Sequence, residues 1–104
     1  MSPDEPSLDA LREAVQQACQ PAYVPKIVAG RERVLALPRQ WVIERLERVA
    51  VQSLDLSDYW EYRRVLELAE LLDSRLVQRF VAIGEHSHDA DVREAAEDFR
   101  TEPA

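Results

Sequence analysis

The sequence is poor in cysteine and glycine, with one Cys and two Gly among its 104 residues. The lone Cys19 excludes a disulfide framework within the chain. The scarcity of glycine and the lack of any Asn-Gly or Asp-Gly pair leave few turns from which a β-sheet could be built. No apolar run approaches the roughly 20 residues that a membrane-spanning helix needs. Neither a disulfide-rich fold nor a spanning helix is therefore expected.

Basic residues are also scarce: 13 Lys and Arg stand against 20 Asp and Glu, which gives a net charge of −7. The charge is uneven, with +3 over residues 21–52 (6 − 3) and −7 over residues 53–104 (6 − 13). Nucleic acids and anionic membranes are bound through Lys and Arg, so we expect neither as a partner. A basic protein partner suits the acidic C-terminal half better.

The length suits one globular domain. Its expected organisation is a flexible N-terminal tail over residues 1–6, a single helical domain over 7–100 and a C-terminal tail over 101–104. The first residues, MSPDEPSLD, lack the basic start and apolar stretch of a signal peptide. We therefore expect a cytoplasmic protein.

Apolar residues recur at helical spacing along most of the chain, which predicts an all-α fold: a compact bundle of five or six short helices. Ser7 is the expected N-cap of the first helix and Pro21 its stop. Only the segment 21–38 resists this pattern, because Pro21, Pro25, Gly30 and Pro38 interrupt it. The expected helices cover about 8–20, a short helix or turns within 26–36, and then 39–53, 58–72, 74–84 and 90–100.

The helix over 58–72 is apolar around most of its circumference, so we predict that it forms the centre of the fold. Only its strip through Arg63, Glu67 and Glu70 looks solvated. Gly84 stands where a helix C-terminus favours a left-handed residue. The predicted core contains Trp41, Trp60, Leu68, Leu72, Phe80 and Phe99.

The stretch from Leu76 to Phe99 resembles a HEAT-type helical repeat, because an apolar helix is followed by a polar turn with Asp and then by Val-Arg-x-x-Ala-x-x-Phe. The resemblance implies HEAT-like helical hairpins and protein binding without chemistry. It also implies that Asp89 or Asp91 caps the second helix and that Val92-Arg93 packs and bonds between units. The preceding pair of helices, 39–53 and 58–72, is a second, degenerate unit in this interpretation.

Metal-ligand residue types cluster only at Glu85-His86-Ser87-His88-Asp89-Ala90-Asp91. A metal-dependent hydrolase centred on Glu85, His88, Asp89 and Asp91 is therefore one alternative function. The Glu-x-x-His spacing of di-metal bundles needs two such pairs, however, and the chain has one. We expect a polar turn with an N-cap here, neither a metal nor a cofactor, and Cys19 in the core.

The remaining feature is a set of carboxylates opposite the apolar positions of two helices. A solvated face is the plain interpretation and an acidic docking surface is the functional one. We predict a non-enzymatic protein–protein interaction module, with an immunity or antitoxin-type protein that neutralises a basic toxin as its narrower form. A structural subunit of a homo-oligomer remains an alternative. The predicted partner-binding residues are Glu67, Glu70, Glu94, Glu97 and Asp98.

Overall fold

Every regular element in the described part of the chain is an α-helix. The computed structural model describes residues 6–20 and 22–100. Its helices are α1 (Leu8–Ala18), α2 (Val24–Ala36), α3 (Arg39–Ser53), α4 (Tyr59–Glu70), α5 (Ser74–Glu85) and α6 (Ala90–Phe99). The prediction of a compact all-α bundle is confirmed, and the predicted tails fall outside the described residues except for Pro6. None of these six helices is both long and apolar enough to cross a membrane.

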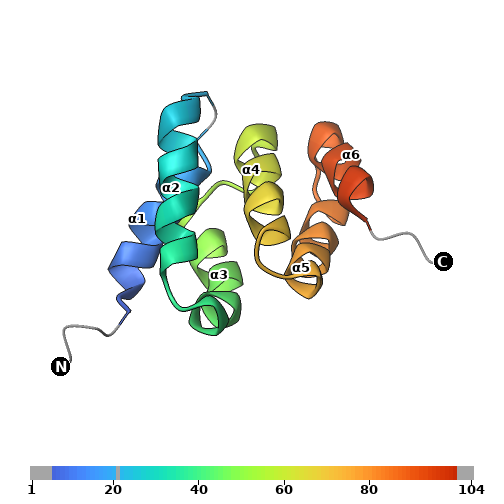
Figure 1. Cartoon of the computed structure of the whole chain (residues 1–104). Coiled ribbons are helices and arrows are strands. Elements are labelled where there is room, and N and C mark those ends of the chain that lie inside the picture. Colours follow the sequence, from blue (N-terminus) through green and yellow to red (C-terminus); the bar gives the residue numbers. More distant parts are fainter. Residues whose placement is uncertain (1–5, 21, 101–104) are drawn as a thin grey trace.

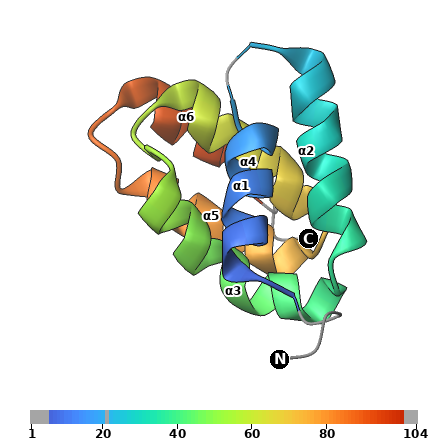
Figure 2. The ribbon, with the colours of Figure 1, turned by 90° about the vertical axis from the view of Figure 1, so that its left-hand side faces the viewer.

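The helices form two sides of an elongated body (Figure 1). On one side α3 packs between α1 and α5; on the other α4 packs against α6. The α1–α2 hairpin and α6 lie at opposite ends of the molecule, and Figure 2 shows the α1–α2 end toward the viewer. Because α4 also contacts α1 and α5, it lies at the centre of the fold as predicted.

The core is apolar and continuous, and α4 contributes more to it than any neighbour through Tyr62, Val65, Leu66, Leu68 and Ala69. The predicted core residues Leu68, Leu72 and Phe80 are buried, and Trp41 and Phe99 are partly buried against the core. Trp60 was wrongly predicted, since it is 48% exposed. Its neighbour two positions on, Tyr62, takes the inward direction, and residues two apart on a helix face different ways.

Four helices begin at a residue whose side chain caps them, and Ser7 and Asp89 were among the predicted caps. Ser7 accepts a hydrogen bond from the backbone N–H of Ala10. Asp58, Asp73 and Asp89 cap α4, α5 and α6 in the same manner, with N···O distances of 3.0, 2.7 and 3.0 Å. The backbone N–H of Arg75 also lowers the pKa of Asp73. Because each cap satisfies an N–H that has no partner within its helix, these residues determine where the helices start.

The segment predicted as a short helix or turns is a full helix of 13 residues, α2. Pro25 lies in its first turn, where the helix requires no N–H donor. Gly30 is buried against α1, and a Cβ there would lie 2.8 Å from the Cα of Ala18. Glycine is therefore used for a close approach of two backbones and does not interrupt the helix.

Gly84 was also predicted wrongly. It lies within α5, and no described residue has a positive φ angle. A Cβ at Gly84 would overlap the ring and hydroxyl of Tyr62, which is fully buried and donates a hydrogen bond of 2.7 Å to the Phe80 carbonyl. Burial raises the pKa of Tyr62 to about 12. Gly84 thus makes room for the largest buried side chain of the core.

Candidate functional site

The predicted partner-binding residues lie in two different environments. Glu70, Glu94, Glu97 and Asp98 are exposed on α4 and α6. Glu70 lies next to the end of α6, because Glu70 and Phe99 line one shallow hollow. These four residues are called the acidic surface below. Glu67 belongs elsewhere, because its side chain is only 25% exposed and lies among three arginines.

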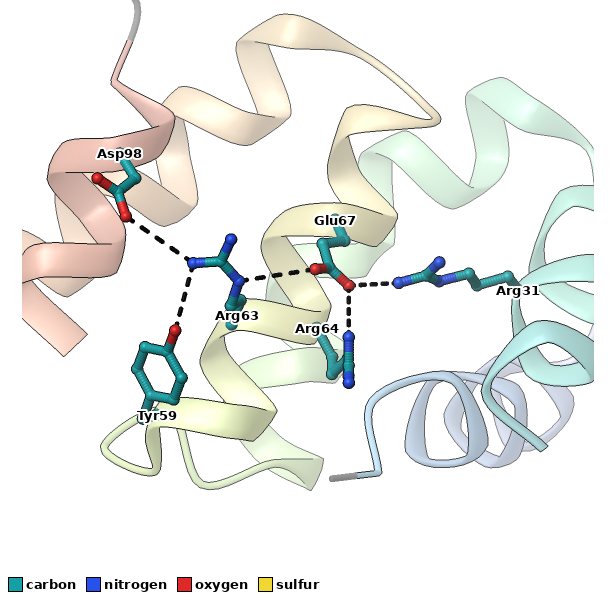
Figure 3. Close-up of polar contacts among 6 residues, drawn as sticks. All are labelled: Arg31, Tyr59, Arg63, Arg64, Glu67 and Asp98. Atoms are coloured by element: carbon teal, nitrogen blue, oxygen red, sulfur yellow. Dashed lines mark hydrogen bonds and ion pairs between the residues drawn. The ribbon is translucent and has the colours of Figure 1, made fainter. Parts of the chain in front are cut away.

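Glu67 was predicted to lie on a solvated strip, but it is the centre of an ion-pair network (Figure 3). Its Oε1 accepts hydrogen bonds from Nη2 of Arg31 at 2.5 Å and from Nη1 of Arg64 at 3.0 Å. Its Oε2 lies 3.7 Å from Nε of Arg63. The expectation of an open, solvated Glu67 is corrected, since one helix turn of α4 and a residue from α2 enclose it.

Arg63 extends the same network to α6 (Figure 3). Its Nη1 lies 3.8 Å from a carboxylate oxygen of Asp98 and donates to the hydroxyl of Tyr59 at 3.3 Å. Its guanidinium also lies over the ring of Phe99, 5.5 Å from the centroid. The pairs Arg31–Glu67 and Arg63–Asp98 therefore connect α2 to α4 and α4 to α6.

The network carries three arginines and two carboxylates, so its net charge is +1 (3 − 2). Within the described residues, neither Glu70 nor Glu94 makes an ion pair, and Glu97 pairs only with Arg100 at 3.2 Å. Net negative charge is concentrated on α6, which has four acidic residues and one basic residue (1 − 4 = −3). The acidic face is smaller than the sequence suggested and lies at one end of the molecule.

An exposed aromatic residue lies at the start of α4. Three aromatics within four residues of a helix cannot share one face, and here Trp60 points outward while Tyr62 points inward. The rings of Tyr59 and Trp60 meet edge to face at 5.0 Å, and the guanidinium of Arg64 lies 5.5 Å from the centroid of the Trp60 ring. The surface next to the network is therefore aromatic and basic.

The segment Glu85–Asp91 covers the last residue of α5, the turn over residues 86–89 and the first two residues of α6. Asp89 caps α6 and accepts from the N–H of Val92, so this role falls to Asp89 and not to Asp91. Glu85 pairs with Arg100 at 2.8 Å, and Arg93 donates to the Ser87 carbonyl within the same turn. Among residues 6–20 and 22–100, no three His, Cys, Asp or Glu side chains are gathered as metal ligands would be.

Cys19 lies fully buried at the C-terminal end of α1, as expected for a residue that fills the core. Burial raises the pKa of its thiol to about 12. Because the thiolate is the reactive form, the thiol at neutral pH is a poor nucleophile. This residue contributes to packing and not to the surface chemistry.

Replacing Glu67 with Gln is expected to lower the free energy of unfolding by about 1–2 kcal/mol, because three guanidinium groups lose the charge that they share. The estimate is at the low end for a charged network, since solvent reaches a quarter of the Glu67 side chain. Urea denaturation measures the change. Glu97→Gln is the matched control and should cost less than about 0.5 kcal/mol. Equal costs for the two variants would contradict the central position given to Glu67.

Sequence reasoning missed the contribution of Arg31, because nothing local connects it to Glu67, which lies 36 residues away. The sequence does indicate the contacts of Glu67 with Arg63 and Arg64, since residues three and four apart on a helix are neighbours. The assembled surface consists of an acidic end, a central ion-pair network and an exposed tryptophan.

Protein-family models, curated proteins and solved structures were compared with the chain, and none of them matches it.

Proposed function

We propose that the protein is a non-enzymatic protein–protein interaction module that binds a basic protein partner through the acidic surface, in the cytoplasm. The observation that carries the proposal is the concentration of exposed carboxylates on α6 and at the adjoining Glu70, two of them without an ion-pair partner among the described residues. A one-signed patch of this kind attracts an oppositely charged protein and orients its approach. Glu67 is connected to this surface through Arg63, which pairs with both Glu67 and Asp98.

An immunity or antitoxin-type protein is the narrower form of this proposal. Such a protein must neutralise a basic target such as a nuclease, whose own binding surface is built to attract phosphates. The acidic surface of this chain would bind the arginines and lysines with which the nuclease binds phosphates, and so block its nucleic-acid site. The same charges oppose nucleic-acid binding by this chain itself.

We also propose that the helices are arranged as HEAT-like hairpins. In support, Asp58 and Asp89 cap α4 and α6, and the residues that follow them meet through the pair Arg63–Asp98. The pair Arg31–Glu67 repeats this link between α2 and α4. Helices on one side of the molecule are thus joined to their neighbours by the same type of contact, as expected of a repeated unit.

Reversing the charge of the acidic surface is expected to abolish partner capture without loss of stability. The test variant carries Glu70→Lys, Glu94→Lys and Glu97→Lys. Asp98 is left intact because it pairs with Arg63. All three positions are exposed, so the melting temperature should change little. The tagged chain is used to capture proteins from a lysate of its native cells, and the captured proteins are identified by mass spectrometry.

The matched control carries Glu13→Lys, Glu32→Lys and Glu44→Lys, three exposed acids on α1, α2 and α3 with the same total change of charge. The wild type and the control should retain one basic protein that the test variant loses. Raising the salt from 0.1 M to 1 M shortens the Debye length from about 10 Å to about 3 Å and should release it. Capture that survives the test reversal, or is lost equally in the control, would contradict the proposed docking surface.

A further inference from the structure

A second surface of different character lies along α2 and α4. Large apolar side chains are exposed on both helices although nothing in the described chain covers them. On α2 the residues Val24, Val28, Arg31 and Leu35 follow the spacing i, i+4, i+7, i+11, so they form one stripe. On α4 the same spacing recurs 36 residues later in Trp60, Arg64, Glu67 and Leu71, the last lying just past the end of the helix.

The two stripes are neighbours. Arg31 of the first stripe and Glu67 of the second are joined by the 2.5 Å contact of the network (Figure 3). The two helices also run in the same direction along the molecule (Figure 1). Each stripe therefore has exposed apolar residues before and after a shared charged centre, and Trp60 and Leu71 are 48% and 49% exposed.

The charged centre of this surface has an excess of hydrogen-bond donors. Three guanidinium groups share the carboxylates of Glu67 and Asp98, although each guanidinium offers five N–H donors. The Nε groups of Arg31 and Arg64 are buried and have no acceptor within the described residues. These buried Nε groups do not face solvent, but the network keeps a net charge of +1 (3 − 2), and the side chains of Arg31 and Arg64 are 25% and 20% exposed. A carboxylate from outside would match this excess positive charge.

We propose that this stripe surface, defined by Val24, Val28, Arg31, Leu35, Trp60, Arg64, Glu67 and Leu71, binds an acidic amphipathic helix of another protein. Apolar residues of that helix would lie on Val28 and Trp60 at one end and on Leu35 and Leu71 at the other. A carboxylate between them would bind Arg31 or Arg64. Trp and Arg are the residue types that carry most binding energy at interfaces, and apolar anchors at helical spacing are typical of helix recognition.

A second copy of this chain fits the surface less well. Its most acidic helix, α6, exposes no large apolar residue, so it offers charge without anchors. The proposed occupant therefore comes from a different protein, and it is acidic where the partner of the acidic surface is basic. The inference does not depend on the proposed function, because the two surfaces attract opposite charges and have no residue in common. Arg63, which pairs with both Glu67 and Asp98, lies between them.

Selection from a library of displayed helical peptides of random surface composition tests the proposal on the full chain. The enriched peptides should carry a net negative charge and apolar residues at helical spacing. Their affinity should fall about tenfold or more with Trp60→Ala and with Arg64→Glu. It should change less than about twofold with Glu94→Lys, which alters only the acidic surface.

Several results would overturn the inference: no enrichment above background, enriched peptides with a net positive charge, or binding that survives both Trp60→Ala and Arg64→Glu. Circular dichroism identifies any variant that fails to fold, and the exposed substitutions Val28→Ser and Leu71→Ser then take its place. Sedimentation of the wild-type chain gives a further test, since a stable dimer broken by Leu71→Ser would assign this surface to a second copy instead. Loss of peptide binding in Glu94→Lys alone would point to the acidic surface and leave the stripe surface unsupported.

Discussion

Replacing Leu68 with alanine is expected to lower the free energy of unfolding by about 2–5 kcal/mol. Leu68 is fully buried in α4, the helix that contacts α1, α5 and α6. Truncation removes apolar contacts with several helices at once and leaves a cavity that close-packed neighbours fill only in part. Native domains of this size are stable by only about 5–15 kcal/mol, so the loss is a large share of the total. Urea denaturation, with a fitted slope as a check on two-state behaviour, measures it.

Leu71→Ala is the matched control for this prediction. It removes the same atoms three residues further along the chain, but Leu71 is 49% exposed and has fewer contacts to lose. Its expected cost is below about 1 kcal/mol. A cost below about 1 kcal/mol for Leu68→Ala itself, or equal costs for both leucines, would mean that α4 is not the central helix of the bundle.

Gly30→Ala should also be strongly destabilising, by about 2 kcal/mol or more, although alanine is the better helix former. Helix propensity alone predicts a gain of about 1 kcal/mol. The added Cβ would, however, lie 2.8 Å from the Cα of Ala18 and the carbonyl carbon of Gln17, and backbone atoms cannot turn away as a side chain can. Overpacking of this kind costs about 1–3 kcal/mol or more, and here it forces α1 away from α2. The difference in melting temperature between the variant and the wild type measures the net effect.

A second substitution separates backbone crowding from side-chain crowding. Ala18→Gly in the Gly30→Ala background removes only a methyl group, so it should not restore stability, because the crowded atoms of residue 18 are its N and Cα. A Gly30→Ala variant that melts higher than the wild type would show that propensity outweighs the contact. That result would contradict the close contact between the backbones of α1 and α2 at Gly30.

The local part of the fold was predictable from the sequence because its causes are local. Ser7, Asp58, Asp73 and Asp89 cap helices by bonding to N–H groups two or three residues ahead, so the pattern is readable in the chain itself. The bounds of α3 followed from its apolar spacing after Pro38. The apolar circumference of α4 likewise indicated its central position.

Most of the errors have a different cause, since they concern contacts between residues far apart in the chain. Gly30 looked like a helix breaker and Gly84 like a left-handed residue at a helix end. Both are glycines because a Cβ would collide, at Gly30 with Ala18 and at Gly84 with Tyr62. Trp60 was assigned to the core with the other apolar residues of α4, but it points outward while Tyr62, two positions on, points inward. Glu67 looked solvated because Arg31, which comes from another helix, could not be placed beside it.

The candidate site was predictable to a similar extent. Glu70, Glu94, Glu97 and Asp98 were identified because residues opposite a helix's apolar face point outward. Their separation from Glu67 depends on the ion pair between Arg31 of α2 and Glu67 of α4, which spacing within one helix does not determine. The stripe surface was missed for the same reason, since its two halves are connected only by Arg31 of α2 and Glu67 of α4, which lie 36 residues apart in the chain.

The rate at which the chain associates with its basic partner tests the central claim most directly. Surface plasmon resonance with the captured partner, at salt concentrations from 0.1 M to 1 M, gives association and dissociation rates for the wild type, the Glu70, Glu94 and Glu97 reversal, and the Glu13, Glu32 and Glu44 reversal. If the acidic surface steers the encounter, the wild-type association rate falls about tenfold or more with salt, and the first reversal removes most of that dependence while the second does not. An association rate that is indifferent to salt and unchanged by the first reversal would contradict an acidic docking surface on α6.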